Sequence, residues 1–334
     1  MLKKSVPVIL IILTLFSSCV HQKNKRIHID ISNVNLPDVK IHRYDVDLFK
    51  IYGGDLKSGL EGIQNEYSLF LGTNLSDPKK LEEMSSYLSN ERNLDFHKAC
   101  VAKYTDLNGL QKDMTKAFKH FKFYYPEINI PLVYTYISGG DYENPVQLTD
   151  NAMIIALDTY LGKDFKPYLS DGVPLYKTLR MTPEHILPDC MKALVDKVYQ
   201  GNPQNGNLLG QMVEAGKKCY FVDAMIPDIS TDLKMGYTLA QLEWIIKNES
   251  HVWAAIIDNQ MLYGTDNHMI RAFMTDGPFT TEFSKDSPPR LGEWIGLQIV
   301  RAYMDENPDV TLQQLMQEND PQRILTLSAY KPGK

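Results

Sequence analysis

The feature that most constrains this chain lies at its N-terminus, where a basic head precedes a short apolar run. Lys3 and Lys4 stand before the apolar residues 6–16, and small residues follow at Ser17 and Ser18. This run is too short to cross a membrane, because a spanning helix needs about 20 apolar residues. A basic head, a short apolar core and small residues together indicate a secretory signal over residues 1–18. No second long apolar run follows, so we expect the remaining residues to fold as a water-soluble body outside the cytoplasm.

The leader ends at Cys19, and the order small, small, cysteine resembles the lipobox of bacterial lipoproteins. In such proteins the cysteine thiol is acylated and becomes the first residue after cleavage. The resemblance implies a lipid such as palmitate on Cys19, an anchor in the cell membrane or the outer membrane, and a lipidated tether over residues 19–38. No acidic run directly follows the cysteine, so we expect the body to face the periplasm. An ordinary cleaved signal with an incidental cysteine is the alternative interpretation.

The charge balance excludes a general affinity for nucleic acid. The chain has 35 lysines and arginines against 41 aspartates and glutamates, a net charge of −6 with neutral histidines, and no basic stripe occurs along it. The remaining cysteines, Cys100, Cys190 and Cys219, allow at most one disulfide and have no metal-ligand spacing. With 43% apolar residues the chain can bury a large core, and we expect a single α+β domain over residues 39–330.

Apolar periodicity predicts a few strands in the first half and mostly helices in the second. Strands are expected at 27–31, 39–44, 131–137 and 151–157. Helices are expected from Asp77-Pro78, over 106–121, over 182–199, along 208–220, from Thr238 to about 262, over 290–305 and from Thr311. This order is typical of a mainly helical α+β fold with a small β-sheet.

The helix expected over 290–305 carries two glycines at G-x-x-x-G spacing, Gly292 and Gly296. In membranes this spacing marks helix dimers, but here the helix belongs to the water-soluble body. The two glycines therefore predict close packing of this helix against another helix of the same body.

No familiar catalytic or metal-binding motif is present in the sequence. The eight histidines include no H-x-x-x-H pair and no HExxH, no Gly-rich phosphate loop follows a strand, and no G-x-S-x-G elbow occurs. We therefore expect no metal site, no cofactor and no catalytic residue. Four tyrosines could line a cleft beside the strands, although aromatic packing explains them more simply: Tyr134, Tyr136, Tyr142 and Tyr160.

Several sequence blocks follow one another over the whole chain after the leader. They are Ile41–Phe49, Tyr134–Gly140, Ile155–Gly162, Leu208–Lys217 with Tyr220, Gly236-Tyr237 with Trp244, Trp253, Gly277–Phe279, and Pro289–Val300 with Tyr303. Together these blocks resemble the gliding-motility-associated lipoprotein GldB family. Their number and order make the resemblance specific, although no single block is diagnostic. The resemblance implies an envelope protein that supports gliding motility or an associated protein-export machinery.

That family is similar, more remotely, to predicted zinc peptidases in which one helix carries HExxH and a later helix carries an acidic residue before glycine. Residues 214–217, Glu-Ala-Gly-Lys, resemble the later helix, which implies a zincin-like, peptidase-type body. The upstream helix, Ile186–Val195, supplies neither the two histidines nor the glutamate that would activate a zinc-bound water. Glu214 lies opposite the face of Leu208, Leu209 and Met212, as a solvated glutamate would.

These inferences predict a non-catalytic, lipid-anchored protein that binds other envelope or gliding-machinery proteins. The candidate cleft or partner-binding residues are Lys217, Tyr237, Trp244 and Trp294, because they lie in the matched blocks and because aromatic and basic side chains suit a recognition surface. One alternative is a divergent metal-dependent hydrolase that uses Glu214 with His185 or His251. The other is a lipoprotein that binds a small ligand or glycan through its tyrosines and tryptophans.

Overall fold

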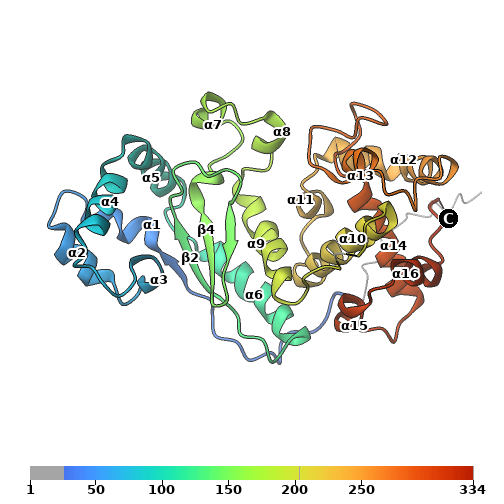
Figure 1. Ribbon diagram of the computed structural model, residues 1–334. Coiled ribbons are helices and arrows are strands. Elements are labelled where there is room, and N and C mark those ends of the chain that lie inside the picture. Colours follow the sequence, from blue (N-terminus) through green and yellow to red (C-terminus); the bar gives the residue numbers. More distant parts are fainter. Residues whose placement is uncertain (1–25, 203, 334) are drawn as a thin grey trace, which may run out of the picture.

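The computed structural model describes residues 26–202 and 204–333, which form a mainly helical fold around a small sheet (Figure 1). The strands in this described part are β1 (Ile41–Arg43), β2 (Leu132–Tyr136), β3 (Val146–Leu148) and β4 (Ala152–Ala156). The helices are α1 (Tyr44–Asp47), α2 (Leu56–Ile63), α3 (Ser68–Leu71), α4 (Pro78–Ser89), α5 (Glu91–Lys103), α6 (Asn108–Tyr124), α7 (Lys166–Ser170), α8 (Leu175–Thr178), α9 (Ile186–Leu194), α10 (Leu208–Met225), α11 (Thr231–Met235), α12 (Leu239–Asp258), α13 (Asn267–Met274), α14 (Leu291–Glu306), α15 (Leu312–Gln317) and α16 (Pro321–Ser328). The predicted α+β class is confirmed.

The strands form one mixed sheet in the order β1-β2-β4-β3. β1 and β4 both pair parallel to β2, whereas β3 pairs antiparallel to β4. β4 therefore lies inside the sheet, and Met153, Ile155 and Ala156 have no exposed surface. A strand buried on both faces needs no polar side, which explains the continuous apolar run in its sequence. β3 is not recognisable from the sequence, because its three residues are too few to show a strand pattern.

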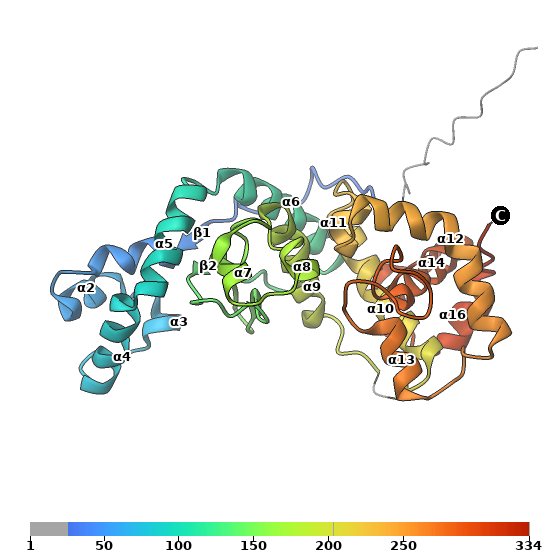
Figure 2. The same cartoon turned by 90° about the horizontal axis from the view of Figure 1, so that it is seen from above.

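The elements are arranged along the molecule in three regions (Figures 1 and 2). Helices α2–α5 lie at one end, the sheet lies in the middle, and helices α10–α16 lie at the other end. α9 packs against β3 and β4, and α6 packs against both α9 and α10, so these two helices join the sheet to the C-terminal helices. The buried apolar side chains form one connected cluster that includes residues from Ile27 to Ile324.

Helices α10 and α14 cross so closely that their backbones touch. A Cβ atom added to Gly296 would lie 1.7 Å from the carbonyl oxygen of Met212, and one added to Gly216 would lie 2.2 Å from the carbonyl oxygen of Gly296. No side chain fits at these distances, so the crossing requires glycine on both helices. The close packing predicted from Gly292 and Gly296 is confirmed, and its partner is α10.

Several helix starts agree with the signals in the sequence. Thr238 and Thr311 form capping boxes at the starts of α12 and α15. Asp77 accepts a hydrogen bond from the backbone N–H of Lys79, and Pro78 is the first residue of α4. The predicted end of α12 near residue 262 is wrong, because the helix ends at Asp258 and Gln260 has a left-handed φ of 56°.

Residues 26–40 follow the surface of the body without forming a regular element. The strand predicted at 27–31 is wrong, because this segment pairs with no strand among the described residues. A turn follows at Ser32 and Asn33, where the Asp30 carboxylate accepts a hydrogen bond from the backbone N–H of Ser32. The Arg26 guanidinium donates to the carbonyl oxygens of Met304 and Asn307, the second at 3.1 Å, and Ile27 is buried. The predicted signal peptide and Cys19 lie outside the described residues.

None of the helices in the described part of the chain combines the length and the apolar character that a membrane crossing needs.

Candidate functional site

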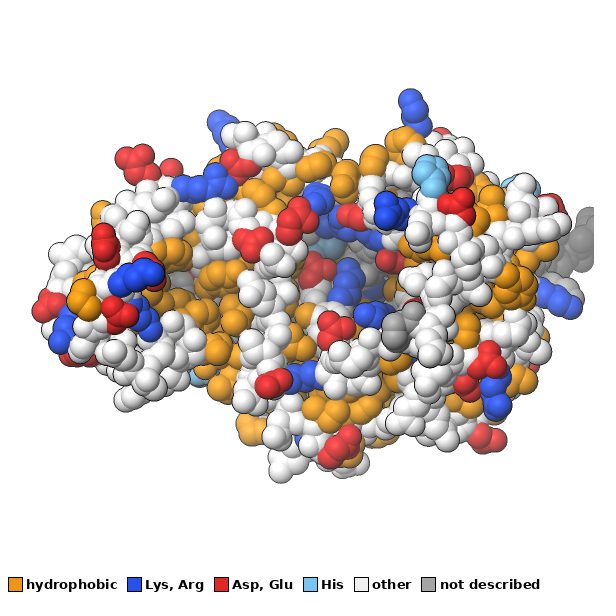
Figure 3. Space-filling model, in the orientation of Figure 1, with side chains coloured by type: hydrophobic (Ala, Val, Ile, Leu, Met, Phe, Trp, Pro, Cys, Tyr) orange, Lys and Arg blue, Asp and Glu red, His pale blue; other side chains and the backbone are white. Residues whose placement is uncertain are grey.

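A cavity of about 720 Å³ lies between the sheet and the C-terminal helices. The space-filling view shows it as a hollow in the middle of one face, with basic side chains visible inside (Figure 3). Its walls come from the loop between β2 and β3, from helices α8, α9, α10, α11 and α14, and from the loop before α14. Sites for small ligands fall in the same range of volumes. The cavity is therefore large enough to hold a small molecule or a few side chains of a protein.

Eleven of the 24 residues that line this cavity are charged, and six of these are basic and five acidic, although the chain as a whole is acidic. The basic residues in the lining are Lys177, Arg180, Lys192, Lys218, Lys234 and Arg290. The acidic residues in the lining are Glu143, Asp189, Asp223, Asp276 and Glu293.

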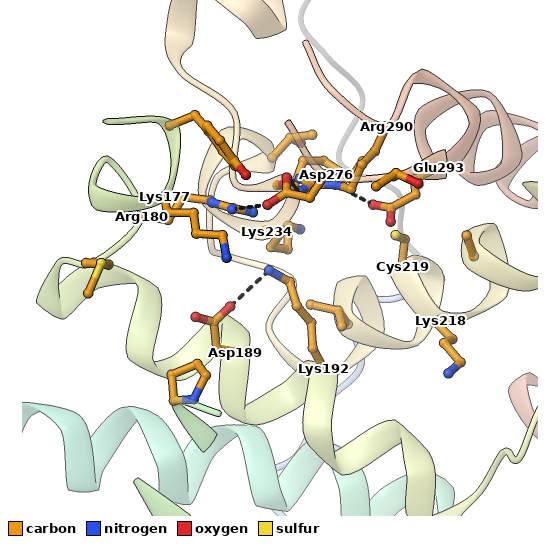
Figure 4. Close-up of a pocket in the computed structure, with 18 of the residues that line it drawn as sticks. Lys177, Arg180, Asp189, Lys192, Lys218, Cys219, Lys234, Asp276, Arg290 and Glu293 are labelled. Atoms are coloured by element: carbon orange, nitrogen blue, oxygen red, sulfur yellow. Dashed lines mark hydrogen bonds and ion pairs between the residues drawn. The ribbon is translucent and has the colours of Figure 1, made fainter. Parts of the chain in front are cut away.

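Asp276 holds two arginines together at one wall of the cavity (Figure 4). Its carboxylate accepts hydrogen bonds from Arg180, which follows α8, and from Arg290, which precedes α14, the latter at 2.5 Å. Arg290 also contacts Glu293 at 3.0 Å and donates to the carbonyl oxygen of Met235. Arg180 thus joins the sheet side of the cavity to the C-terminal helices.

Asp223 of α10 forms a second buried centre, with one cation on each side. Lys234 lies 2.7 Å and Arg301 2.5 Å from its carboxylate oxygens, and the Asp223 side chain is only 3% exposed. Burial alone would raise the pKa of Asp223, but Arg301 and Lys234 hold this pKa below its ordinary value. Asp223 is therefore a carboxylate at neutral pH and fixes α11 and α14 against α10.

We expect Asp223→Asn to destabilise the protein by about 3 kcal/mol at neutral pH, because it leaves the buried Lys234 and the partly exposed Arg301 without their common counter-ion. The measurement is the midpoint of urea unfolding, followed by tryptophan fluorescence. Asp196→Asn is the matched control, since Asp196 is 62% exposed and contacts Lys218 at 3.5 Å. Exposed pairs contribute about 0–1 kcal/mol, so this control should unfold almost like the wild type.

The same variant tests the direction of the pKa shift. A carboxyl group whose pKa is lowered by folding stabilises the protein above the pKa of the unfolded chain, about 3.9 for aspartate, and loses this contribution as pH falls through the lower folded value. The difference in unfolding free energy between wild type and Asp223→Asn should therefore shrink below about pH 4. A difference that stays constant from pH 7 to pH 3 would contradict the lowered pKa.

Helix α9 contributes an ion pair to the cavity (Figure 4). The Lys192 ammonium group donates to Asp189 at 3.0 Å, and the Tyr160 hydroxyl donates to the other oxygen of Asp189 at 3.0 Å. Lys177 extends from α8 into the same space and contacts Glu143 at 2.5 Å. Cys219 of α10 also lines the cavity, and burial raises the pKa of its thiol to about 12, so the thiol is protonated at neutral pH.

The four residues predicted to form a recognition surface do not line this cavity. Lys217 is fully buried, where its ammonium group donates to the carbonyl oxygen of Glu318 at 2.8 Å and lies 4.1 Å from the Tyr199 ring centre. Burial lowers the pKa of Lys217, an effect that Glu214 opposes. The structure therefore corrects its interpretation as a cleft residue, because a fully buried lysine cannot contact a partner.

The aromatic members of that set have structural partners. Tyr237 is buried behind the cavity wall, and its hydroxyl donates to the carbonyl oxygen of Arg290 at 3.3 Å. Trp294 is buried, and its indole N–H donates to Glu249 at 2.8 Å. Trp244 is half-buried against Phe283. The structure does not bring these side chains together in one cleft, whereas two of the four tyrosines considered for a cleft, Tyr142 and Tyr160, do line the cavity.

Glu214 is not solvated, contrary to the expectation from its helix face. Its carboxylate accepts hydrogen bonds from the Tyr199 hydroxyl and, at 2.6 Å, from the Asn205 amide, and its side chain is 13% exposed. Among the described residues, its hydrogen-bond and ion-pair partners are Tyr199, Asn205 and Lys217, and none of them is a histidine. His185 is buried with its ring nitrogen 2.9 Å from the Thr182 hydroxyl, and His251 is exposed on α12.

Sequence reasoning missed the charged residues that line the cavity. Asp189 and Lys192 are three residues apart on one helix, a spacing that marks a shared face and could have drawn attention to them. Arg180 follows α8, whereas Asp276 and Arg290 lie at the two ends of the loop between α13 and α14, and no sequence pattern relates the three residues. In the described residues, no group of three or more His, Cys, Asp or Glu side chains is arranged to hold a metal ion.

Comparison with protein families matches residues 24–332 to the family described as gliding motility protein GldB. No curated protein and no solved structure matches the chain.

Proposed function

Since the chain belongs to the gliding motility protein GldB family, we propose that it is a lipid-anchored envelope protein that binds a partner protein in its central cavity and catalyses no reaction. In this proposal the lipid on Cys19 holds the protein at a membrane, and the body faces the periplasm. The bound partner belongs to the gliding apparatus or to its associated protein-export machinery. The peptidase-type origin of the cavity stays a prediction from the sequence.

The observation that carries the proposal is the ion pair of α9. In the zinc peptidases that the family remotely resembles, the corresponding helix presents two imidazoles and a glutamate to the cavity. Here α9 presents Asp189 and Lys192, which neutralise each other at 3.0 Å. A protonated lysine has no lone pair to offer a metal ion or a proton, whereas it donates well to the oxygen atoms of a bound chain. The chemistry of this wall favours recognition over hydrolysis.

The other polar groups of the cavity support the same function. The basic groups Arg180, Arg290 and Lys234 are held in fixed positions by Asp276 and Asp223. A binding site needs such fixed groups, because side chains that are already ordered lose little entropy when a partner binds. The apolar part of the lining, which includes Met181, Val222 and Leu297, gives a partner side chain a surface to pack on.

We expect a photo-crosslinking amino acid at Tyr176, which lines the cavity, to capture one defined envelope protein in intact cells. The matched control is the same amino acid at Tyr52, which is 51% exposed, precedes α2 in the chain and does not line the cavity. The proposal predicts a discrete adduct at Tyr176 and none of that mass at Tyr52, as read by immunoblot and mass spectrometry.

Two results would contradict the proposal. Equal adducts at both positions, or none at the cavity, would count against partner binding there. Stoichiometric zinc in the purified protein that disappears on replacing His185 or His251 would favour the hydrolase alternative instead.

A further inference from the structure

We infer that the cavity recognises a carboxylate group of an acidic protein segment, which Lys177 and Lys192 bind between them. This inference rests on the proposed function, because it assigns the carboxylate to the partner that occupies the cavity. It adds the chemical class of the ligand and the two residues that select it.

The two lysines reach the same space from different elements. Lys177 extends from α8 and Lys192 from α9, and the close-up shows both side chains directed into the cavity (Figure 4). Their side chains are 26% and 42% exposed, so a ligand can reach both ammonium groups. Each ammonium group has three N–H donors. Within the described residues, Lys177 forms an ion pair with Glu143, and Lys192 forms one with Asp189.

Little free energy is needed to break these two ion pairs. Glu143 is 74% exposed, so water screens its attraction to Lys177. Asp189 keeps a second hydrogen-bond donor in the Tyr160 hydroxyl, so it remains partnered when Lys192 turns toward a ligand. A carboxylate that enters between the lysines can therefore accept hydrogen bonds from both without leaving a buried charge alone.

The inner carboxylates favour an anionic ligand over a cationic one. Asp276 is already bound by Arg180 and Arg290, and Asp223 is already bound by Lys234 and Arg301. A cationic ligand at Asp223 would have to break a buried ion pair and leave Lys234 without its partner. At Asp276, which is 31% exposed, it would have to compete with two arginines. An anionic ligand meets the basic excess of the lining and displaces nothing buried.

The test measures binding of short labelled peptides to the full, lipidated protein in detergent by fluorescence anisotropy at low salt. The probes are amidated pentaglutamate, amidated pentaglutamine and pentaglutamine with a free C-terminal carboxylate, each with a zwitterionic dye. We expect pentaglutamate to bind at least tenfold more tightly than amidated pentaglutamine, and this preference to fall in about 0.5 M salt, where charges are screened within a few ångströms.

The double variant Lys177→Gln with Lys192→Gln should weaken pentaglutamate binding at least fivefold. Among single variants at position 192, Lys192→Arg keeps the positive charge and should therefore keep most of the affinity that Lys192→Gln loses. The matched control combines Lys57→Gln with Lys79→Gln, which removes two exposed, ion-paired lysines from α2 and α4. This control should bind pentaglutamate like the wild type. Circular dichroism checks that both double variants are folded.

The peptides also distinguish the two sources of the carboxylate. Tight binding of pentaglutamate assigns recognition to acidic side chains, and tight binding of pentaglutamine with a free C-terminus assigns it to the end of the partner chain. Equal affinity of all three peptides, no binding of any, or binding that ignores Lys177 and Lys192 would overturn the inference. If Tyr176 still crosslinks a partner in that case, the proposed function survives, whereas absence of that crosslink is a failure of the proposed function itself.

Discussion

Replacing Gly296 by alanine should lower the unfolding free energy by about 3 kcal/mol, because the new methyl group would lie 1.7 Å from the carbonyl oxygen of Met212. The obstacle is backbone and not the end of a flexible side chain, so it cannot turn away. Helices α10 and α14 would have to move apart, which would open the packing around Ile295 and Met212, both without exposed surface. The measurement is the shift of the urea or thermal unfolding midpoint.

Gly62→Ala is the matched control for this prediction. Gly62 also lies in a helix, α2, but nothing is within 4 Å of a Cβ atom placed there. Alanine has a higher helix propensity than glycine by about 1 kcal/mol, so this variant should be unchanged or slightly more stable. If Gly296→Ala were as stable as Gly62→Ala, the direct backbone contact between α10 and α14 would be refuted.

Replacing Cys19 by alanine should move the protein from the membrane fraction to the soluble fraction or leave it with an uncleaved leader. In this prediction the Cys19 thiol carries the lipid anchor, and each buried CH₂ of an acyl chain contributes about 0.8 kcal/mol to membrane binding. No helix within residues 26–202 and 204–333 could replace such an anchor by spanning the membrane. Fractionation, together with mass spectrometry of the N-terminus, measures both outcomes.

Cys219→Ala serves as the control, because Cys219 is a half-buried thiol in α10. That variant should stay lipidated, processed and membrane-bound. A Cys19→Ala protein that is processed and membrane-held like the wild type would show that the anchor is not on this cysteine.

Much of the fold could be predicted because it depends on local signals. Helix-start signals act within one helical turn, so they can be recognised in the sequence and are found in the structure. Examples are the capping boxes of Thr238 and Thr311 and the Asp77-Pro78 start of α4. The apolar run of β4 likewise needs no distant information. The strand predictions fail where tertiary contacts determine whether a strand forms. Residues 27–31 alternate like a strand but pair with none, and β3 exists only because β4 offers it an edge.

The candidate site could be predicted far less well. Lys217 and Trp294 looked suited to recognition by their chemical type, yet both are buried by their neighbours. Asp189 and Lys192 are not among the site residues predicted from the sequence, yet they line the cavity together with Lys177. Burial depends on which helices pack against each other, and the local sequence of one helix does not show which helix packs against it.

The N-terminal leader and the lipid-carrying cysteine are predictions from the sequence alone, and the α+β class and the close approach of the helix that contains Gly292 and Gly296 are sequence predictions that the structure confirms. Each of these depends on residues close together in the chain. The partner of that helix and the charged cavity become visible only in the folded protein. Arg180, Asp276 and Arg290 are up to 110 positions apart in the chain, and they attract one another only after the helices have packed. Charges act through space, so their arrangement appears only with the fold.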